Sequence, residues 1–285
     1  MQRLNKDYAV KNNLIAVKDV ATLPVKVLQF GEGNFLRAFT VWMIEEMNRK
    51  GNFNGRVQVV QPIEQGLVKA MSEQDYLYTL YLRGVQDGVV YNEHSVISAI
   101  ADGIDPYSDY AAYLKAAHNP DLRVIVSNTT EAGIVYAPED FIKDKCPASF
   151  PAKLTAFLYE RYSYFQGAMD RGFIIIPCEL IERNGTKLKE AVLKYAEQWK
   201  LEAAFVAWIK EANAFLSTLV DRVVSGYPRD EAADLEAKLG YQDSFIDVGE
   251  YFHLLVIEGD SKYAKELPFT EAGLNVVWTD DMTPY

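Results

Sequence analysis

The sequence predicts an α/β protein with a doubly wound, mostly parallel sheet. Short apolar runs rich in β-branched residues alternate along the chain with segments whose apolar residues recur at helical spacing. The first of these runs ends at two glycines, and polar side chains follow several of the later runs. Because ligands bind outside the carboxyl ends of the strands in open α/β sheets, the same pattern predicts where functional residues gather.

The first predicted strand and helix meet at a glycine-rich turn. Residues 25–30 form the strand, Gly31 and Gly33 lie in the turn, and residues 34–49 form the helix. Glycines let backbone N–H groups approach a phosphate, and the helix N-terminus adds unpaired donors and a favourable dipole. Leu36 replaces the third glycine of the G-x-G-x-x-G motif. An ordinary βα turn and a methyltransferase-type glycine loop are therefore alternatives.

A dinucleotide is the expected cofactor of this Rossmann-like fold. The second predicted strand, residues 57–61, ends at Gln61, where such folds usually place an acidic residue on the adenosine ribose. An amide can bond a ribose hydroxyl, and no arginine follows that would bind a ribose phosphate, which favours NAD over NADP. The alternative for Gln61 is a solvated strand end. The residues assigned to the cofactor at these two strand ends are Leu28, Gln29, Phe30, Gly31, Glu32, Gly33, Asn34, Phe35, Leu36, Arg37, Ala38 and Gln61.

The middle of the chain is predicted to extend the sheet. Residues 76–83 and 89–100 are rich in aromatic and β-branched residues, which is typical of a hairpin or of two inserted strands. A helix is expected over residues 105–117, with its aspartate as the cap and the following proline at its first position. Residues 122–126 are continuously apolar, as in a buried parallel strand.

Small polar side chains follow that central strand. Asn128, Thr129, Thr130 and Glu131 stand at its carboxyl end, where ligands bind in open α/β sheets, and they are assigned to the cofactor. The alternative is a helix capping box formed by a threonine and a nearby acid. The residues alone leave both interpretations open.

The second half of the predicted nucleotide fold repeats the alternation of helix and strand. Residues 150–165 have helical periodicity, residues 172–176 form the next buried strand, and helices are expected over residues 186–199 and 202–215. Glu179 closely follows the strand, so its carboxylate is a candidate for the substrate side of the site. The alternative is that it is solvated or caps a helix.

The composition is that of a soluble globular protein. Of the 285 residues, 49% are hydrophobic and 24% are charged, and the net charge is -11. No basic cluster interrupts the acidic background, which argues against binding to nucleic acid or to anionic membranes. The first residues contain no apolar leader and no run approaches a membrane span, so we expect a cytoplasmic protein. Cys146 and Cys178 lack neighbouring histidines, so neither a disulfide framework nor a metal site is predicted.

Four motifs stand in order along the chain, at residues 29–38, 127–133, 177–185 and 219–223. Together they resemble the mannitol dehydrogenase family of long-chain polyol dehydrogenases, from about Val25 to the last residue. The resemblance implies a Rossmann domain followed by a mainly helical substrate domain. It also implies zinc-independent hydride transfer with NAD, and a sugar acid or polyol as the substrate.

The resemblance further implies which residues stand near the substrate. These are Glu179, Ser217, Asp221 and Arg222. The wider family has asparagine where Ser217 stands, although a hydroxyl can still bond a substrate oxygen. The family's catalytic group is a lysine in a K-x4-N-x2-H motif. That motif does not occur in this sequence, and the family would place it just beyond Tyr285.

The expected organisation is an NAD-binding Rossmann domain over residues 1–225, followed by residues 226–285 as the start of the helical domain. We expect this second domain to be truncated, because so few residues cannot enclose a core of their own. The expected function is an oxidoreductase of hexuronate metabolism that interconverts a keto sugar acid and its hydroxy acid. The alternative is a non-catalytic dinucleotide-binding module.

Overall fold

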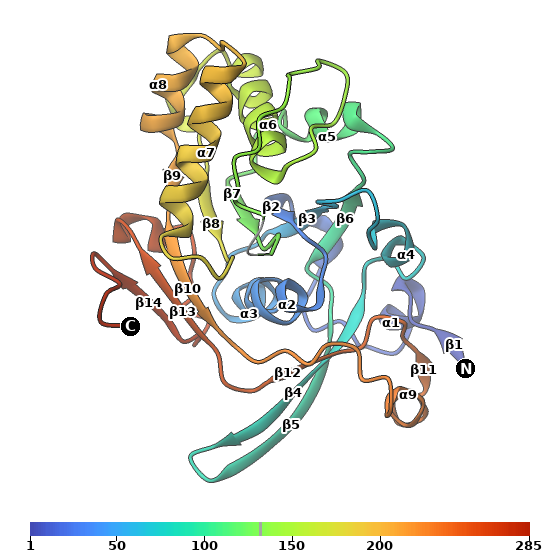
Figure 1. Cartoon of the computed structure of the whole chain (residues 1–285). Helices are drawn as coiled ribbons and strands as arrows, with labels where there is room; N and C mark the ends of the chain where they lie inside the picture. The colour runs from blue at the N-terminus through green and yellow to red at the C-terminus, as the bar shows by residue number, and fades with distance from the viewer. Residues whose placement is uncertain (131–132) are drawn as a thin grey trace.

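A six-stranded parallel sheet forms the centre of the structure, a computed structural model that describes residues 1–130 and 133–285 (Figure 1). Its strand order is β6-β3-β2-β7-β8-β9, and every neighbouring pair is parallel. In chain order this is the 3-2-1-4-5-6 arrangement of a Rossmann fold, which confirms the predicted fold class. The strands are β2 (Val25–Phe30), β3 (Arg56–Val60), β6 (Ile100–Ile104), β7 (Val124–Ser127), β8 (Ile174–Pro177) and β9 (Ala214–Phe215).

Helices cover both faces of this sheet (Figure 1). One face packs against the helix that follows the glycine turn, which runs without a break through α2 (Asn34–Leu36), the π-helical turn η2 (Arg37–Val41) and α3 (Trp42–Lys50). The other face packs against a second group of helices, whose core includes Leu28, Phe30 and Ile125. These helices are α5 (Tyr110–Ala116), α6 (Phe150–Tyr164), α7 (Asn184–Gln198) and α8 (Ala203–Ala212).

Three local predictions are wrong. The helix expected over residues 202–215 ends at Ala212, and residues 214–215 form the strand β9. The helix expected over residues 105–117 begins only at Tyr110, with Asp109 as its cap, because Asp105 instead accepts a hydrogen bond from the Tyr107 N–H and closes a turn. The capping box proposed for residues 129–130 has no helix to cap, since the described residues 133–149 contain none. The next helix, α6, is capped by Ser149.

Three smaller sheets surround the Rossmann core. The predicted hairpin is present as β4 (Tyr78–Gln86) and β5 (Val89–Ile97), and β12 (Asp247–Glu250) pairs with β4 in parallel. A second sheet has the order β10-β13-β14, and a third pairs β1 with β11. The remaining elements are β1 (Gln2–Arg3), α1 (Lys6–Lys11), η1 (Val20–Thr22), α4 (Val68–Ser72), η3 (Met169–Arg171), β10 (Ser217–Asp221), α9 (Ala232–Leu239), β11 (Tyr241–Gln242), β13 (Leu254–Glu258), η4 (Ser261–Lys265) and β14 (Val276–Thr279).

The segment after residue 225 is joined to the rest of the fold by these sheets. Strand β12 pairs with β4, and β13 pairs antiparallel with β10, so strands from both sides of the expected domain boundary share hydrogen bonds. The boundary at residue 225 stays a prediction. Among the described residues, no helix has the length and apolar character needed to cross a membrane.

Candidate functional site

The turn after β2 requires a glycine at its first position. Gly31 has φ of +115°, a conformation that L-residues rarely adopt. A Cβ atom there would lie 3.1 Å from the Asn128 carbonyl oxygen and 3.2 Å from Leu36 Cδ1. The missing side chain therefore lets the turn approach the loop that follows β7.

Gly33 has a different role, because its surroundings are open. It is the N-cap of α2, with φ of -70° and ψ of 171°, and a Cβ atom there would meet nothing within 4 Å. A glycine cap offers no side-chain acceptor, so it leaves the first N–H groups of the helix available to a ligand. These donors and the helix dipole favour an anion such as a phosphate at this position.

The turn lies beside the point where the strand order reverses, between β2 and β7. Phe30 pairs with Ser127 at the carboxyl ends of these strands, which is where ligands bind in open α/β sheets. A cleft of about 860 Å³ opens there. Its lining includes five of the residues predicted from the sequence, namely Phe35, Asn128, Thr130, Asp221 and Arg222.

Glu179 is a buried carboxylate that organises the loop after β7. It is 2% exposed and accepts hydrogen bonds from Ser127 Oγ, Thr129 N and Thr129 Oγ1, each at 3.0 Å. Burial raises the pKa of Glu179, and these hydrogen bonds oppose the rise. Glu179 also borders a cavity of about 690 Å³ that shares Leu180 and Val220 with the first cleft. The alternative of a solvated or capping carboxylate is therefore wrong, since its oxygens are committed to the loop.

Asn184 has a site role that sequence reasoning did not assign to it. It is fully buried, and its Nδ2 donates to the carbonyl oxygens of Pro177, Glu179 and Thr218. Its Oδ1 accepts from the N–H groups of Gly185 and Thr218. One amide thus ties the end of β8 to β10. In the sequence, Asn184 can be found as the asparagine of an Asn-Gly pair that begins a helix shortly after a strand.

Ser217 is a buried residue at the end of the β10–β13 ladder. It is 4% exposed, it pairs with Glu258, and it lines neither of the two cavities. The chain packs closely here, since a Cβ atom on Gly185 would lie 2.8 Å from Ser217 N. The expected contact between the Ser217 hydroxyl and a substrate is therefore not supported by its position.

Gln61 is turned away from the surface that an adenosine ribose would need. Its side chain is 4% exposed, and its Nε2 donates to the Glu64 carbonyl at 3.0 Å. Glu32 lies beside it, accepts from Leu67 N at 2.9 Å and has its pKa raised by burial. Both side chains pack against Gly66, where a Cβ atom would lie within 2.4 Å of each. The loop over residues 64–67 therefore uses the Gln61 amide that was assigned to the ribose.

Arg222 borders the cleft but donates its hydrogen bonds to the protein backbone. Its Nη1 donates to the Ala38 carbonyl at 2.6 Å, and its remaining nitrogens donate to the carbonyls of Phe252 and Tyr251. Its guanidinium lies 4.0 Å from the Trp42 ring centroid, and burial lowers its pKa to about 10. Arg222 thus supports the π-helical turn behind the site, and the expectation that it contacts the substrate is not supported.

Several other residues assigned to the cofactor are part of the core. Gln29 is fully buried, and its Nε2 donates to the Gly31 carbonyl at 2.9 Å, which steadies the turn from within. Glu131 lies outside the described residues. The assigned residues that are buried in the core beneath or behind the turn are Leu28, Gln29, Phe30, Leu36, Arg37 and Ala38.

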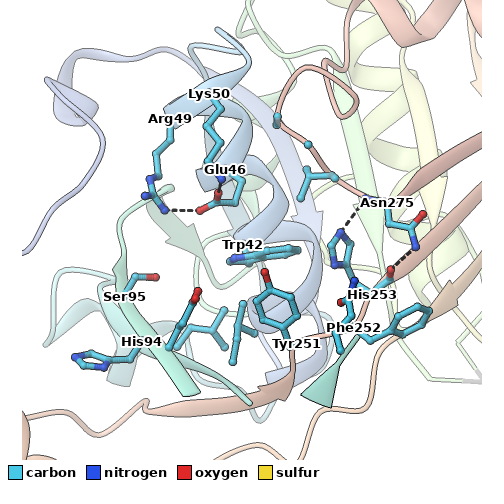
Figure 2. Close-up of a pocket in the computed structure, with 17 residues that line it drawn as sticks. Trp42, Glu46, Arg49, Lys50, His94, Ser95, Tyr251, Phe252, His253 and Asn275 are labelled. Atoms are coloured by element: carbon cyan, nitrogen blue, oxygen red, sulfur yellow. Dashed lines mark hydrogen bonds and ion pairs between the residues drawn. The ribbon is translucent and has the colours of Figure 1, made fainter. Parts of the chain in front are cut away.

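A separate cavity of about 670 Å³ runs along α3, on the side of Trp42 and Tyr251 (Figure 2). Three of its charged groups form one cluster, because Glu46 binds both Arg49 and Lys50. Of its two histidines, His94 and His253, the second has its pKa lowered to about 4, first by burial and then by Arg222. None of the described residues that the sequence assigned to a ligand lines this cavity. The described residues also contain no group of three or more His, Cys, Asp or Glu suited to hold a metal ion.

The strand order, the open glycine cap and the cleft at the reversal of the sheet define a Rossmann domain of the dinucleotide-binding class. Comparison with known proteins specifies the family. A sequence model described as the mannitol dehydrogenase Rossmann domain matches residues 25–271. The chain belongs to the mannitol dehydrogenase family, which confirms the resemblance seen in the sequence.

Individual relatives agree with this assignment. The chain is 52% identical over 286 residues to an altronate oxidoreductase of Bacillus subtilis, covering all of this chain and 58% of the relative. It is 50% identical over 266 residues to an altronate oxidoreductase of Escherichia coli, covering 93% of this chain and 55% of the relative. The chain thus spans a little over half the length of the curated relatives it matches.

Solved structures show the same fold. A Pseudomonas fluorescens mannitol 2-dehydrogenase, described as a ternary complex with NAD and D-mannitol, superimposes with a TM-score of 0.79 at 23% identity. That match covers all of this chain and 59% of the other. A D-sorbitol dehydrogenase gives a TM-score of 0.78 at 22% identity, over 99% of this chain and 60% of the other.

Proposed function

We propose that this chain is the NAD-binding part of an oxidoreductase that interconverts a keto sugar acid and its hydroxy acid, specifically tagaturonate and altronate, without zinc. The observation that carries the proposal is the open N-cap at Gly33, where no side chain caps the helix and an added Cβ atom would meet nothing within 4 Å. The relatives at 50–52% identity are named altronate oxidoreductases, which supports the choice of substrate.

The residues around the glycine turn fit a dinucleotide. Gly33 and the N–H groups that follow it would hold the pyrophosphate, because the first N–H groups of a helix have no intrahelical partner and no side chain caps them here. The cleft lined by Phe35, Asn128 and Thr130 would receive the part of the cofactor that extends past the β2–β7 boundary. When bound, NAD supplies the hydride acceptor or donor of the reaction. The protein's contribution at this site is to bind and orient it.

The surroundings of β3 support NAD over NADP. The strand ends at Val60, and Gln61 follows it. The Gln61 side chain donates to the Glu64 carbonyl, and the acidic side chain of Glu32 packs beside it against Gly66. A ribose 2′-phosphate at this position would face a carboxylate, which is unfavourable, whereas ribose hydroxyls would carry no charge to be repelled.

A thermal-shift comparison tests the cofactor class. NADH should raise the melting temperature of the 285-residue chain, because a ligand that binds the native state stabilises it, and S-adenosylmethionine should not. A rise with S-adenosylmethionine alone would contradict the proposal and favour the methyltransferase-type loop. Following NADH absorbance with tagaturonate, in the protein that carries this chain, tests the chemistry. NADH binding without turnover there would favour the non-catalytic module.

A further inference from the structure

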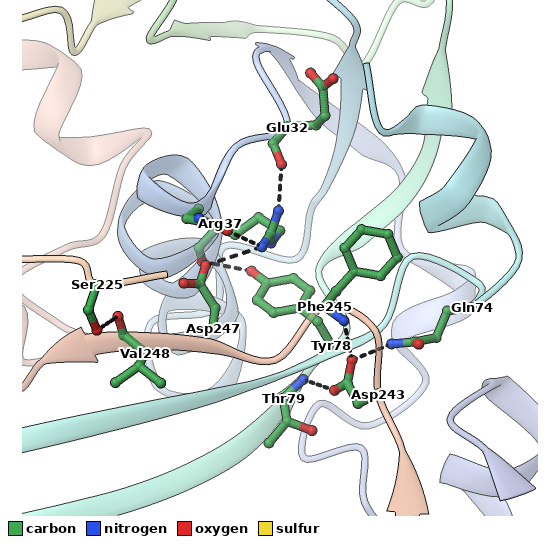
Figure 3. A network of polar contacts seen from close by, with 11 residues as sticks. Glu32, Arg37, Gln74, Tyr78, Thr79, Ser225, Asp243, Phe245, Asp247 and Val248 are labelled. Carbon is green, nitrogen blue, oxygen red and sulfur yellow. Dashed lines mark hydrogen bonds and ion pairs between the residues drawn. The ribbon is translucent and has the colours of Figure 1, made fainter. Parts of the chain in front are cut away.

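Arg37 is a buried arginine directly behind the glycine turn (Figure 3). Its side chain is 2% exposed. Its Nη1 donates to the Glu32 carbonyl at 2.7 Å, and its Nη2 donates to Asn34 Oδ1 at 2.6 Å. Glu32 and Asn34 are the two neighbours of Gly33, so one guanidinium bonds the chain on both sides of the open N-cap.

Two aromatic rings and a main-chain contact hold this arginine in place. Its Cζ lies 5.5 Å from the ring centroid of Tyr78 and 5.6 Å from that of Phe245, within the range of cation–π attraction. The Tyr78 hydroxyl also donates to the Arg37 carbonyl at 2.7 Å, inside the π-helical turn η2. Both the side chain and the main chain of Arg37 are therefore fixed by the strand β4.

Asp247 supplies the counter-charge. Its Oδ2 lies 3.6 Å from Arg37 Nη2, and both side chains are buried. Neither carboxylate oxygen of Asp247 has a hydrogen-bond partner among the described residues, so its ion pair with Arg37 is its main polar contact. A buried cation without a partner is strongly unfavourable. Because Asp247 belongs to β12, which pairs with the strand that carries Tyr78, the whole clamp rests on one small sheet.

We propose that Arg37 is a positioning residue for dinucleotide binding, which holds Glu32 and Asn34 so that the N–H groups behind Gly33 face the phosphates, and that it does not touch the dinucleotide itself. The inference rests on the proposed function. The sequence motif predicts that Arg37 contacts the cofactor. In the structure, its guanidinium instead donates to Glu32 and Asn34 of the protein. A turn that is already ordered loses less conformational entropy when it binds the dinucleotide. Arg37 contributes to affinity by reducing this entropy cost.

Arg37→Lys is the test substitution, with Arg161→Lys as its matched control. Lysine keeps the positive charge near Asp247, but a single ammonium cannot reproduce the planar fork that bonds Glu32 and Asn34 together. Arg161 is equally buried, lies between two phenylalanine rings and belongs to α6 on the other face of the sheet. Its guanidinium donates to four backbone carbonyls remote from the glycine turn, those of Ala117, Asn119, Leu122 and Arg171.

Fluorescence titration with NADH and thermal unfolding are measured on the wild type and both variants. Both substitutions should lower the melting temperature. Only Arg37→Lys should weaken NADH binding, by about tenfold or more, while Arg161→Lys stays within about twofold of the wild type. Equal NADH affinity for wild type and folded Arg37→Lys would overturn the inference, because Arg37 would then serve stability alone.

Asp247→Asn keeps the inference testable if Arg37→Lys does not fold. Removing the counter-charge leaves the guanidinium buried without an ionic partner and loosens its hold on the Glu32 carbonyl, so NADH should bind severalfold more weakly. Wild-type affinity in a folded Asp247→Asn would count against the inference. A wild type that fails to bind NADH would instead overturn the proposed function itself, which separates the two failures.

Discussion

Gly33→Val separates the shape of the turn from its capacity to bind phosphate. The backbone at Gly33 has φ of -70° and ψ of 171°, which valine adopts without strain, and the new Cβ atom would meet nothing within 4 Å. Replacing a glycine at such a position also reduces the entropy of the unfolded chain, which stabilises a protein by about 0.4–1 kcal/mol. The variant should therefore fold, with a melting temperature equal to or slightly above that of the wild type.

Its NADH affinity should fall sharply. The added methyl groups occupy the space in front of the helix N-terminus, so the pyrophosphate loses backbone donors. Hydrogen bonds to a charged group contribute about 1.5–3 kcal/mol each. Losing two of them weakens binding by about 100-fold or more, since each ~1.4 kcal/mol is a factor of ten.

Fluorescence titration of the folded variant with NADH measures this loss. Gly84→Val is the control, because Gly84 lies in the β4–β5 hairpin, where a Cβ atom would make only an ordinary contact of 3.5 Å with Tyr251. The control should bind NADH as the wild type does. A folded Gly33→Val variant that retained wild-type affinity would refute the placement of the pyrophosphate.

Three further predictions follow from the same site and its core. Gly31→Ala should lose about 1–3 kcal/mol of stability by urea denaturation, because its φ of +115° strains any L-residue; an unchanged denaturation midpoint would contradict this. NADH should bind more tightly than NADPH in parallel calorimetric titrations, since a 2′-phosphate would face Glu32; equal dissociation constants would show that the ribose lies elsewhere. Burial raises the pKa of Glu45 to about 7, above its unfolded value, so the stability gained by its protonation is complete below about pH 4.5 and is lost as the pH rises through 7. Glu45→Gln should remove about 2–3 kcal/mol of the difference in unfolding free energy between pH 5 and pH 8, and a variant with the wild-type pH dependence would disprove that assignment.

The parts of the fold that the sequence predicted are those specified by local patterns. Residues 25–30 form β2 as expected, and the helix expected over residues 34–49 runs to Lys50. In both segments the spacing of apolar residues records which faces are buried. The strand-to-helix turn was also visible, because two glycines one residue apart mark a sharp turn, and Gly31 adopts a φ of +115° that L-residues rarely take.

The interior of that helix was not predictable from its own residues. Its π-helical turn places carbonyl groups where the Tyr78 hydroxyl and the Arg222 guanidinium donate to the carbonyls of Arg37 and Ala38. Such a turn depends on donors from residues distant in the sequence, and no local pattern encodes it. For the same reason Arg222 was expected at the substrate, although its donors reach the helix instead.

The site residues show the same division. Asn128 and Thr130 were expected at a ligand site because they follow a strand, and both line the cleft. Parallel strands end at one edge of the sheet, so this part of the arrangement can be predicted from sequence position. The orientation of Gln61 depends on the loop over residues 64–67, and the burial of Glu179 depends on hydroxyl donors at Ser127 and Thr129. These are tertiary contacts, so sequence position alone could place the residues but not direct their side chains.

A crystal structure of the chain with NADH would test the central claim most directly. We predict pyrophosphate oxygens within hydrogen-bonding distance of the N–H groups that follow Gly33, with the cofactor continuing into the cleft beside Asn128 and Thr130. A dinucleotide bound in the separate cavity along α3, beside Trp42 and Tyr251, would contradict the claim.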